Sequence, residues 1–154
     1  MKIIIGKAGQ GKTIKVADLA MEALESVRNV LICSDELSWI EFYNHTHARM
    51  EGILSVEPRG TLVFKQVDRV SQGDIFKAIV DHDVSIVFVD AYLNERNLAL
   101  LDIVCKQLNI ECYKTLQANA HASNGAPLQI IDWDEHLGID EPEEVIEVWK
   151  SQTQ

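Results

Sequence analysis

The sequence predicts a three-layer α/β/α fold around a mainly parallel sheet. Short apolar runs rich in β-branched residues alternate along the chain with longer segments whose apolar residues recur at helical spacing. The apolar runs are nearly continuous, which is typical of strands buried on both faces of a parallel sheet. Right-handed crossovers between such strands place helices on both sides of the sheet. At 154 residues and 47% hydrophobic, the chain (residues 1–154) is expected to form a single domain with its own core.

Six segments are expected to be strands, because each is a short apolar run bounded by glycine, proline or polar residues. These segments are residues 2–5, 29–33, 61–67, 84–89, 110–116 and 128–131. Ligands of such folds bind outside the carboxyl ends of the strands. Polar residues just beyond those ends, such as Gly6, Asp35, Asp90 and Gln117, should therefore share one edge of the molecule.

Five segments are expected to be helices, either from the helical spacing of their apolar residues or from a capping pair at their start. They are residues 13–27, 38–50, 72–81, 95–108 and 140–150. Two of them begin with a residue pair suited to cap a helix. Ser38 is followed three residues later by Glu41, and Asp140 is followed by Glu143.

Composition and charge indicate which binding partners and which cellular compartment suit the chain. The net charge of -10 means that an acidic surface would repel a phosphodiester backbone, so the charge does not support single-stranded nucleic acid as a partner. Cys33, Cys105 and Cys112 each lie in an apolar run, which predicts buried free thiols instead of disulfides. No segment has the length and hydropathy of a membrane span, and no signal-peptide pattern begins the chain, so we expect a cytoplasmic protein.

One glycine-rich segment matches the Walker A phosphate-binding motif in every fixed position. Residues 6–13 read Gly-Lys-Ala-Gly-Gln-Gly-Lys-Thr, and they follow a predicted strand and open a predicted helix. Glycines allow backbone N–H groups to surround phosphate oxygens, and the helix N-terminus attracts the same anion. Lys12 is expected to bind the β and γ phosphates, and the hydroxyl of Thr13 to coordinate Mg²⁺. The expected nucleotide-binding residues are Gly6, Ala8, Gly9, Gln10, Gly11, Lys12 and Thr13.

An acid follows the most apolar of the internal strands. The run 84–89 ends at Asp90, which is the Walker B arrangement in which the carboxylate holds Mg²⁺ through water. Many strands end at aspartate, so a simple strand-end cap is the alternative interpretation. The preceding Walker A motif favours the metal-binding interpretation, with Thr13 and Asp90 as the metal-binding residues.

These motifs, in this order, resemble the RecA-like ATPases, in particular the ATPase core of DnaB-type replicative helicases and their KaiC-like relatives. The resemblance extends to about residue 120 and implies a RecA-like P-loop NTPase fold that binds ATP and Mg²⁺. In the family's pattern Glu36, after the second strand, corresponds to the catalytic base, although the neighbouring Asp35 is a competing candidate. Gln117, after the fifth strand, corresponds to the polar residue that senses the γ-phosphate.

The resemblance leaves three functions open. The first is an ATP hydrolase that couples its nucleotide state to a protein or nucleic-acid partner, or to further copies of itself. The second is a non-hydrolysing helicase-core mimic or regulator that acts by protein–protein binding. It is favoured because Lys150 is the only lysine or arginine after Lys114, so a basic residue lent to a neighbour's ATP site has no counterpart. The third is a P-loop small-molecule kinase, although no arginine cluster follows the third strand.

Overall fold

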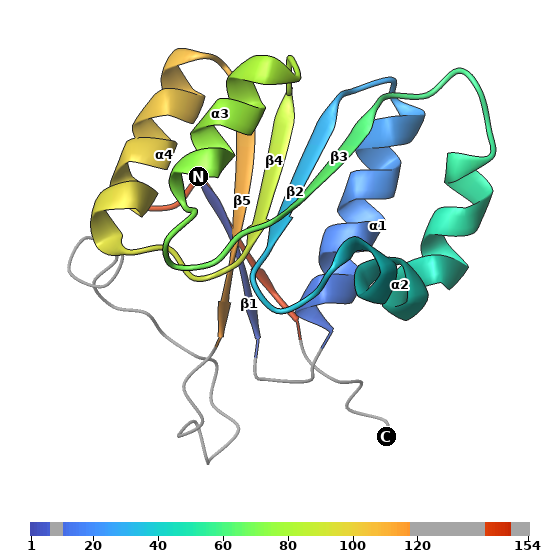
Figure 1. Ribbon diagram of the computed structural model, residues 1–154, viewed down its shortest axis with the longest axis horizontal. Helices are drawn as coiled ribbons and strands as arrows, with labels where there is room; N and C mark the ends of the chain where they lie inside the picture. The colour runs from blue at the N-terminus through green and yellow to red at the C-terminus, as the bar shows by residue number, and fades with distance from the viewer. Residues whose placement is uncertain (7–10, 118–140, 149–154) are drawn as a thin grey trace.

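A single parallel sheet organises the protein. The computed structural model describes residues 1–6, 11–117 and 141–148. Within these ranges six strands pair in the order β3-β2-β4-β5-β1-β6, and every pairing is parallel (Figure 1). The strands are β1 (Lys2–Gly6), β2 (Val30–Ser34), β3 (Leu62–Gln66), β4 (Ile86–Asp90), β5 (Glu111–Gln117) and β6 (Glu144–Glu147).

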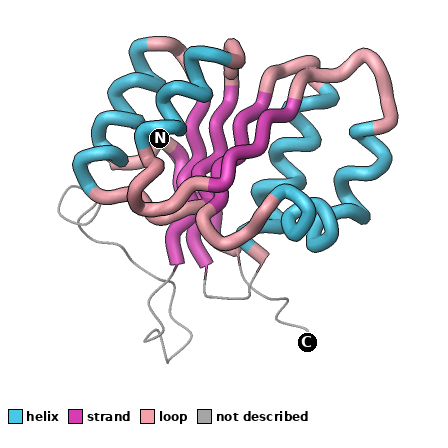
Figure 2. Tube along the Cα trace, in the orientation of Figure 1, coloured by secondary structure: helices cyan, strands magenta, loops and turns pink. Residues whose placement is uncertain are grey.

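Four helices in the described ranges cover the two faces of the sheet. They are α1 (Lys12–Glu25), α2 (Trp39–Leu54), α3 (Gly73–Asp81) and α4 (Glu95–Gln107). Figures 1 and 2 show α1 and α2 on one side of the strands and α3 and α4 on the other. This arrangement confirms the predicted three-layer α/β/α fold.

Helix starts follow the local sequence. Ser38 and Glu41 form the predicted capping box at the start of α2, with the Ser38 side chain accepting a hydrogen bond from the Glu41 backbone. Asn94 caps α4 by accepting a hydrogen bond from the backbone N–H of Asn97 at 2.8 Å. By contrast, the residue before α1 is Gly11, whose φ of 90° lies in the left-handed region and which has no side chain to cap the helix.

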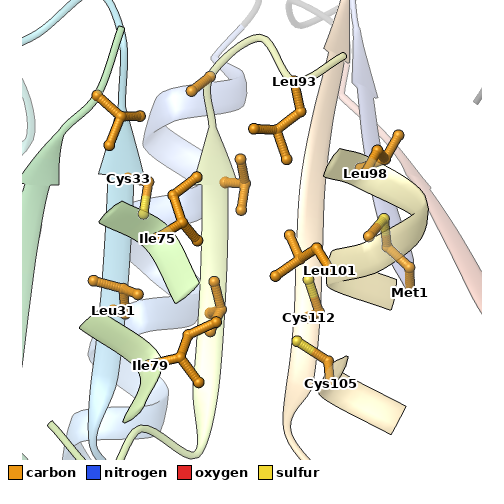
Figure 3. Packing of buried hydrophobic residues seen from close by; sticks show 14 of the residues in the cluster. Met1, Leu31, Cys33, Ile75, Ile79, Leu93, Leu98, Leu101, Cys105 and Cys112 are labelled. Carbon is orange, nitrogen blue, oxygen red and sulfur yellow. The ribbon is translucent and has the colours of Figure 1, made fainter. Parts of the chain in front are cut away.

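Two apolar clusters, one on each face of the sheet, form the core. The cluster beneath α3 and α4 includes Ile75, Leu101 and all three cysteines, and Figure 3 shows these side chains filling the space between helices and strands. The cluster beneath α1 and α2 is built around Leu24, Phe42 and Phe88. Cys33, Cys105 and Cys112 are buried and free, which confirms the prediction for the thiols. No helix in the described residues is long and apolar enough to cross a membrane.

The last predicted helix is wrong. Residues 144–147, which lie within the expected helix 140–150, form β6 and pair in parallel with β1. The β-branched Ile146 and Val148 alternate with outward-facing residues and pack against the core under α1. Backbone hydrogen bonds hold the strand, including one from Val148 N–H to the Ile5 carbonyl at 2.8 Å. An unpaired edge of β1 therefore outweighs the weak helical pattern, which illustrates how tertiary context overrides propensity.

Two further expectations in the same region depend on residues outside the described ranges. The expected strand 128–131 lies wholly outside them, as does Asp140 of the proposed capping pair. The other member of that pair, Glu143, instead accepts a hydrogen bond from the amino group of Met1 at 3.3 Å. Its carboxylate therefore forms an ion pair with the amino group that precedes β1.

Candidate functional site

A cavity of about 1140 Å³ opens at the carboxyl ends of the strands. Its walls come from the start of α1, the segments after β2 and β4, the end of β5 and the first turns of α2. Ser34 pairs with Asp90, and Gly6 pairs with Gln117, so the strand ends that the sequence marked lie side by side. This is the edge at which open α/β sheets bind their ligands.

Asp90 lies between two hydroxyl groups. The Thr13 hydroxyl, from the first turn of α1, donates a hydrogen bond to one carboxylate oxygen of Asp90 at 2.8 Å. The Thr115 hydroxyl, from β5, donates to the other oxygen, also at 2.8 Å. The structure thus brings the Walker A threonine and the strand-end aspartate, 77 residues apart in sequence, into direct contact. Charge-assisted hydrogen bonds of this kind fix the orientation of the carboxylate.

The Thr13–Asp90 pair has the chemistry of a magnesium site. Hydroxyl and carboxylate oxygens are the hard ligands that Mg²⁺ prefers, and Mg²⁺ is usually held by one or two such groups together with phosphates and water. Oxygens 2.8 Å apart are close enough to share one hydrated ion. The residues present therefore fit Mg²⁺.

Lys12 lies over the end of β1. Its ammonium group donates a hydrogen bond to the Gly6 carbonyl at 3.0 Å. Burial lowers the pKa of Lys12, and the negative charges of Asp90 and Glu36 oppose that change. The lysine is therefore held at the mouth of the cavity, within the electrostatic reach of two of the acids predicted for the site.

The two described glycines of the motif each have a structural reason to be glycine. A Cβ on Gly6 would lie 2.5 Å from the backbone oxygen of Val148, so only glycine allows β1 to approach the segment after β6 this closely. Gly11 has the left-handed φ of 90° described above. The other expected phosphate-binding residues, Ala8, Gly9 and Gln10, lie outside the described residues.

The two adjacent acids after β2 have different surroundings. Both line the cavity, but the carboxylate of Asp35 accepts a hydrogen bond from the backbone N–H of Tyr92 at 2.9 Å. Asp35 therefore ties the segment after β2 to the segment after β4. Glu36 instead acts electrostatically on Lys12, and Asp35 acts in the same way on Lys114.

Gln117 ends β5 opposite Gly6 and lines the same cavity. Its side chain is exposed, so it lies at the rim of the site beside the start of the glycine-rich segment. The position is consistent with contact to a bound phosphate.

Two residues of β5 at this site escaped the sequence analysis. Thr115 holds Asp90, and Lys114 is only 6% exposed although it lines the cavity. Burial lowers the pKa of Lys114 to about 8, against the opposing effect of Asp90 and Asp35. The sequence offered one signal, which is that Lys114 lies inside a predicted strand of a sheet expected to be buried on both faces. Lysine is rarely buried without a partner, so a lysine at such a position suggests a special role.

The comparisons with known proteins support the fold. The solved structure of flagellar accessory protein FlaH from Methanocaldococcus jannaschii matches with a TM-score of 0.58 at 16% sequence identity. The match covers 75% of this chain and 60% of that one. Neither protein-family models nor curated protein sequences gave a match.

The chain thus has an α/β fold with a six-stranded parallel sheet in its described residues, and this fold is similar to that of FlaH. At 16% identity the likeness shows the fold alone, and the chain spans about 60% of the length of the FlaH structure. Closer kinship with DnaB-type or KaiC-like proteins stays a prediction.

Proposed function

We propose that the protein binds MgATP at the cavity beyond the strand ends and hydrolyses it slowly. The observation that carries this proposal is the 2.8 Å hydrogen bond between Thr13 and Asp90. It unites a Walker A hydroxyl with a strand-end carboxylate in the arrangement that P-loop proteins use for Mg²⁺. The matching RecA-like fold supports the same class of ligand.

Each side chain of the site has a defined task in this proposal. Lys12 and the N-terminal amides of α1 bind the β and γ phosphates. Mg²⁺ held by Thr13 and Asp90 would neutralise charge on those phosphates. Glu36 orients the attacking water and accepts its proton as the oxygen bonds to the γ phosphorus and the bond to ADP breaks. Gln117 donates a hydrogen bond to the γ-phosphate.

The charge of the cavity supports a need for the metal. Four carboxylates and two ammonium groups line it in the described part of the chain: Asp35, Glu36, Glu41 and Asp90 against Lys12 and Lys114. This excess of negative charge opposes a bare triphosphate. A triphosphate that arrives with Mg²⁺ carries less negative charge and meets a smaller barrier.

The output of such a site is a change of conformation passed to a partner. We propose a protein partner or further copies of this chain, in agreement with the acidic surface. FlaH, whose fold is similar, is named a flagellar accessory protein.

The experiment measures ATP binding and phosphate release by the wild type, Lys12→Ala, Glu36→Gln and Asp35→Asn, with and without single-stranded DNA. Lys12→Ala should weaken binding by at least about tenfold, because it removes a charge-assisted contact to phosphate. Glu36→Gln should retain binding and lose about 10²-fold or more in phosphate release, as expected for removal of a general base. Asp35→Asn is the matched control, since it removes a neighbouring charge but keeps an acceptor for Tyr92.

Other results would select another function. Phosphate release unchanged by Glu36→Gln would remove that residue as the base. Binding without any phosphate release would favour the regulator that acts by protein contact. Transfer of phosphate to an added nucleoside or other acceptor would favour the kinase, and failure of the wild type to bind ATP would refute the proposal.

A further inference from the structure

Lys114 presents an ammonium group to the cavity from the middle of the sheet. It lies on β5, between β4 and β1, and is only 6% exposed. The one hydrogen-bond acceptor of its ammonium group among the described residues is the carbonyl of the next residue, Thr115. Since an ammonium group offers three donors, this leaves hydrogen-bonding capacity unused in a buried place.

The nearest acids do not fill that capacity. Asp90 and Asp35 act on Lys114 electrostatically, yet in the described part of the chain neither carboxylate accepts a hydrogen bond from its ammonium group. The hydrogen bonds that Asp90 accepts come instead from the Thr13 and Thr115 hydroxyls. One oxygen of Asp35 accepts the Tyr92 N–H. A buried charge without its full set of hydrogen bonds is costly, and an apolar residue of similar volume would cost less at this place. The lysine therefore suits an anion that none of the described residues supplies as a hydrogen-bond partner.

The position of Lys12 indicates which anion. Lys12 and Lys114 line the same cavity from α1 and β5, and the charge of Lys12 lowers the pKa of Lys114. An anion that contacts both ammonium groups reduces the repulsion between them. Thr13 and Asp90, the proposed ligands of Mg²⁺, line the same cavity as the two lysines.

We propose that Lys114 is a binding residue for the terminal phosphate of a nucleoside triphosphate, and that it makes the site prefer a triphosphate to a diphosphate. This inference rests on the proposed function and adds to it a second cation from the same chain. The site then needs no basic residue from another subunit to neutralise the terminal phosphate.

The test compares the affinities of the wild type and of Lys114→Met for the non-hydrolysable triphosphate AMP-PNP and for ADP, both with Mg²⁺. Lys114→Met should weaken AMP-PNP binding by about ten- to a hundredfold, which is the usual effect of removing one charged hydrogen bond. ADP binding should change by less than about threefold, because ADP lacks the terminal phosphate. Lys77→Met is the matched control, as it removes one lysine from the exposed surface of α3 and should change neither affinity.

Several results would overturn the proposal. Equal losses of AMP-PNP and ADP affinity, or no loss of either, would show that Lys114 does not bind the terminal phosphate. Binding of neither nucleotide by the wild type would refute the proposed function and this inference together, whereas normal wild-type binding without discrimination by Lys114 would refute this inference alone. Lys114→Gln, which removes the charge but keeps a donor for the Thr115 carbonyl, repeats the comparison if the methionine variant does not fold.

Discussion

Lys114 is a residue whose protonation opposes folding. Its pKa of about 8 in the folded chain lies below its ordinary value of 10.5 because burial disfavours the ammonium form. Below pH 8 the folded and unfolded chains both hold the proton, so folding bears the full cost of the buried charge. Between pH 8 and pH 10.5 the unfolded chain binds more protons, so the free energy of unfolding rises with pH in this window.

The prediction at this residue is that Lys114→Met is more stable than the wild type at pH 7, by up to about 3 kcal/mol. The advantage should shrink as pH rises through 8 to 10, since the wild-type lysine then loses its proton. Urea unfolding of both proteins at pH 7 and pH 9.5 checks this, and the difference between them cancels the other titrating groups. If the variant were less stable than the wild type at pH 7, the charged lysine would make a net stabilising contribution to the folded chain.

Sequence alone could single out Lys12, Thr13 and Asp90 as candidates, because each belongs to a short motif beside a strand or a helix, and the structure places all three at one cavity. Lys114 and Thr115 could not be recognised in this way. Their burial depends on β5 lying between β1 and β4, which is a long-range property of the sheet. Sequence could not separate Glu36 from Asp35 either, because their surroundings differ only in the folded chain, where Asp35 accepts a hydrogen bond from Tyr92 and Glu36 acts electrostatically on Lys12.

At the scale of elements, two glycines differ in the space that surrounds them. Gly60 precedes β3, and a Cβ there would lie 1.7 Å from the Arg28 carbonyl oxygen. The backbone N–H of Gly60 also donates to the Leu24 carbonyl at 2.9 Å, which fixes this segment against the end of α1. Gly52, by contrast, lies within α2, and an added Cβ would meet no atom within 4 Å.

These surroundings predict opposite effects of alanine. Gly60→Ala should lower the free energy of unfolding by about 3 kcal/mol or more, because backbone atoms must move apart. Gly52→Ala should raise it by about 0.5–1 kcal/mol, because alanine restricts the unfolded chain and favours helix. Thermal or urea unfolding measures both, and a Gly60→Ala protein as stable as the wild type would contradict the close contact.

The elements themselves were largely predictable. Strands β1 to β5 and helices α1 to α4 each overlap the expected segments, since their apolar periodicity is strong. The exception is β6, a short run in which Ile146 and Val148 alternate with exposed residues. The acidic pair Asp140 and Glu143 instead suggested the start of a helix. The strand form of β6 depends on the edge of β1, which no local pattern reveals.

At the scale of the whole molecule, β6 covers the edge of β1 beside the site. It then forms the edge of the sheet itself, as a short strand that begins and ends with glutamate. Without it, β1 would expose its backbone N–H and C=O groups as an edge strand, which is a template for pairing with another chain. Ending the chain at residue 142 should therefore lower the melting temperature and produce concentration-dependent association. Ending it at Val148 keeps β6 and serves as the control, and size-exclusion chromatography with thermal unfolding distinguishes the two. A monomeric, fully stable protein ending at residue 142 would show that β6 is dispensable.

The order of the strands has a mechanical consequence. Glu111, at the start of β5, binds Lys2 of β1 at 2.9 Å and Arg28, after α1, at 3.0 Å. The other end of β5 carries Lys114, Thr115 and Gln117 into the cavity. With one end clamped by ion pairs and both edges hydrogen-bonded to neighbours, β5 cannot slide along its own axis without breaking these bonds. Strand β5 therefore stays fixed within the sheet. We expect any movement that a ligand causes to occur in the segments that surround the cavity.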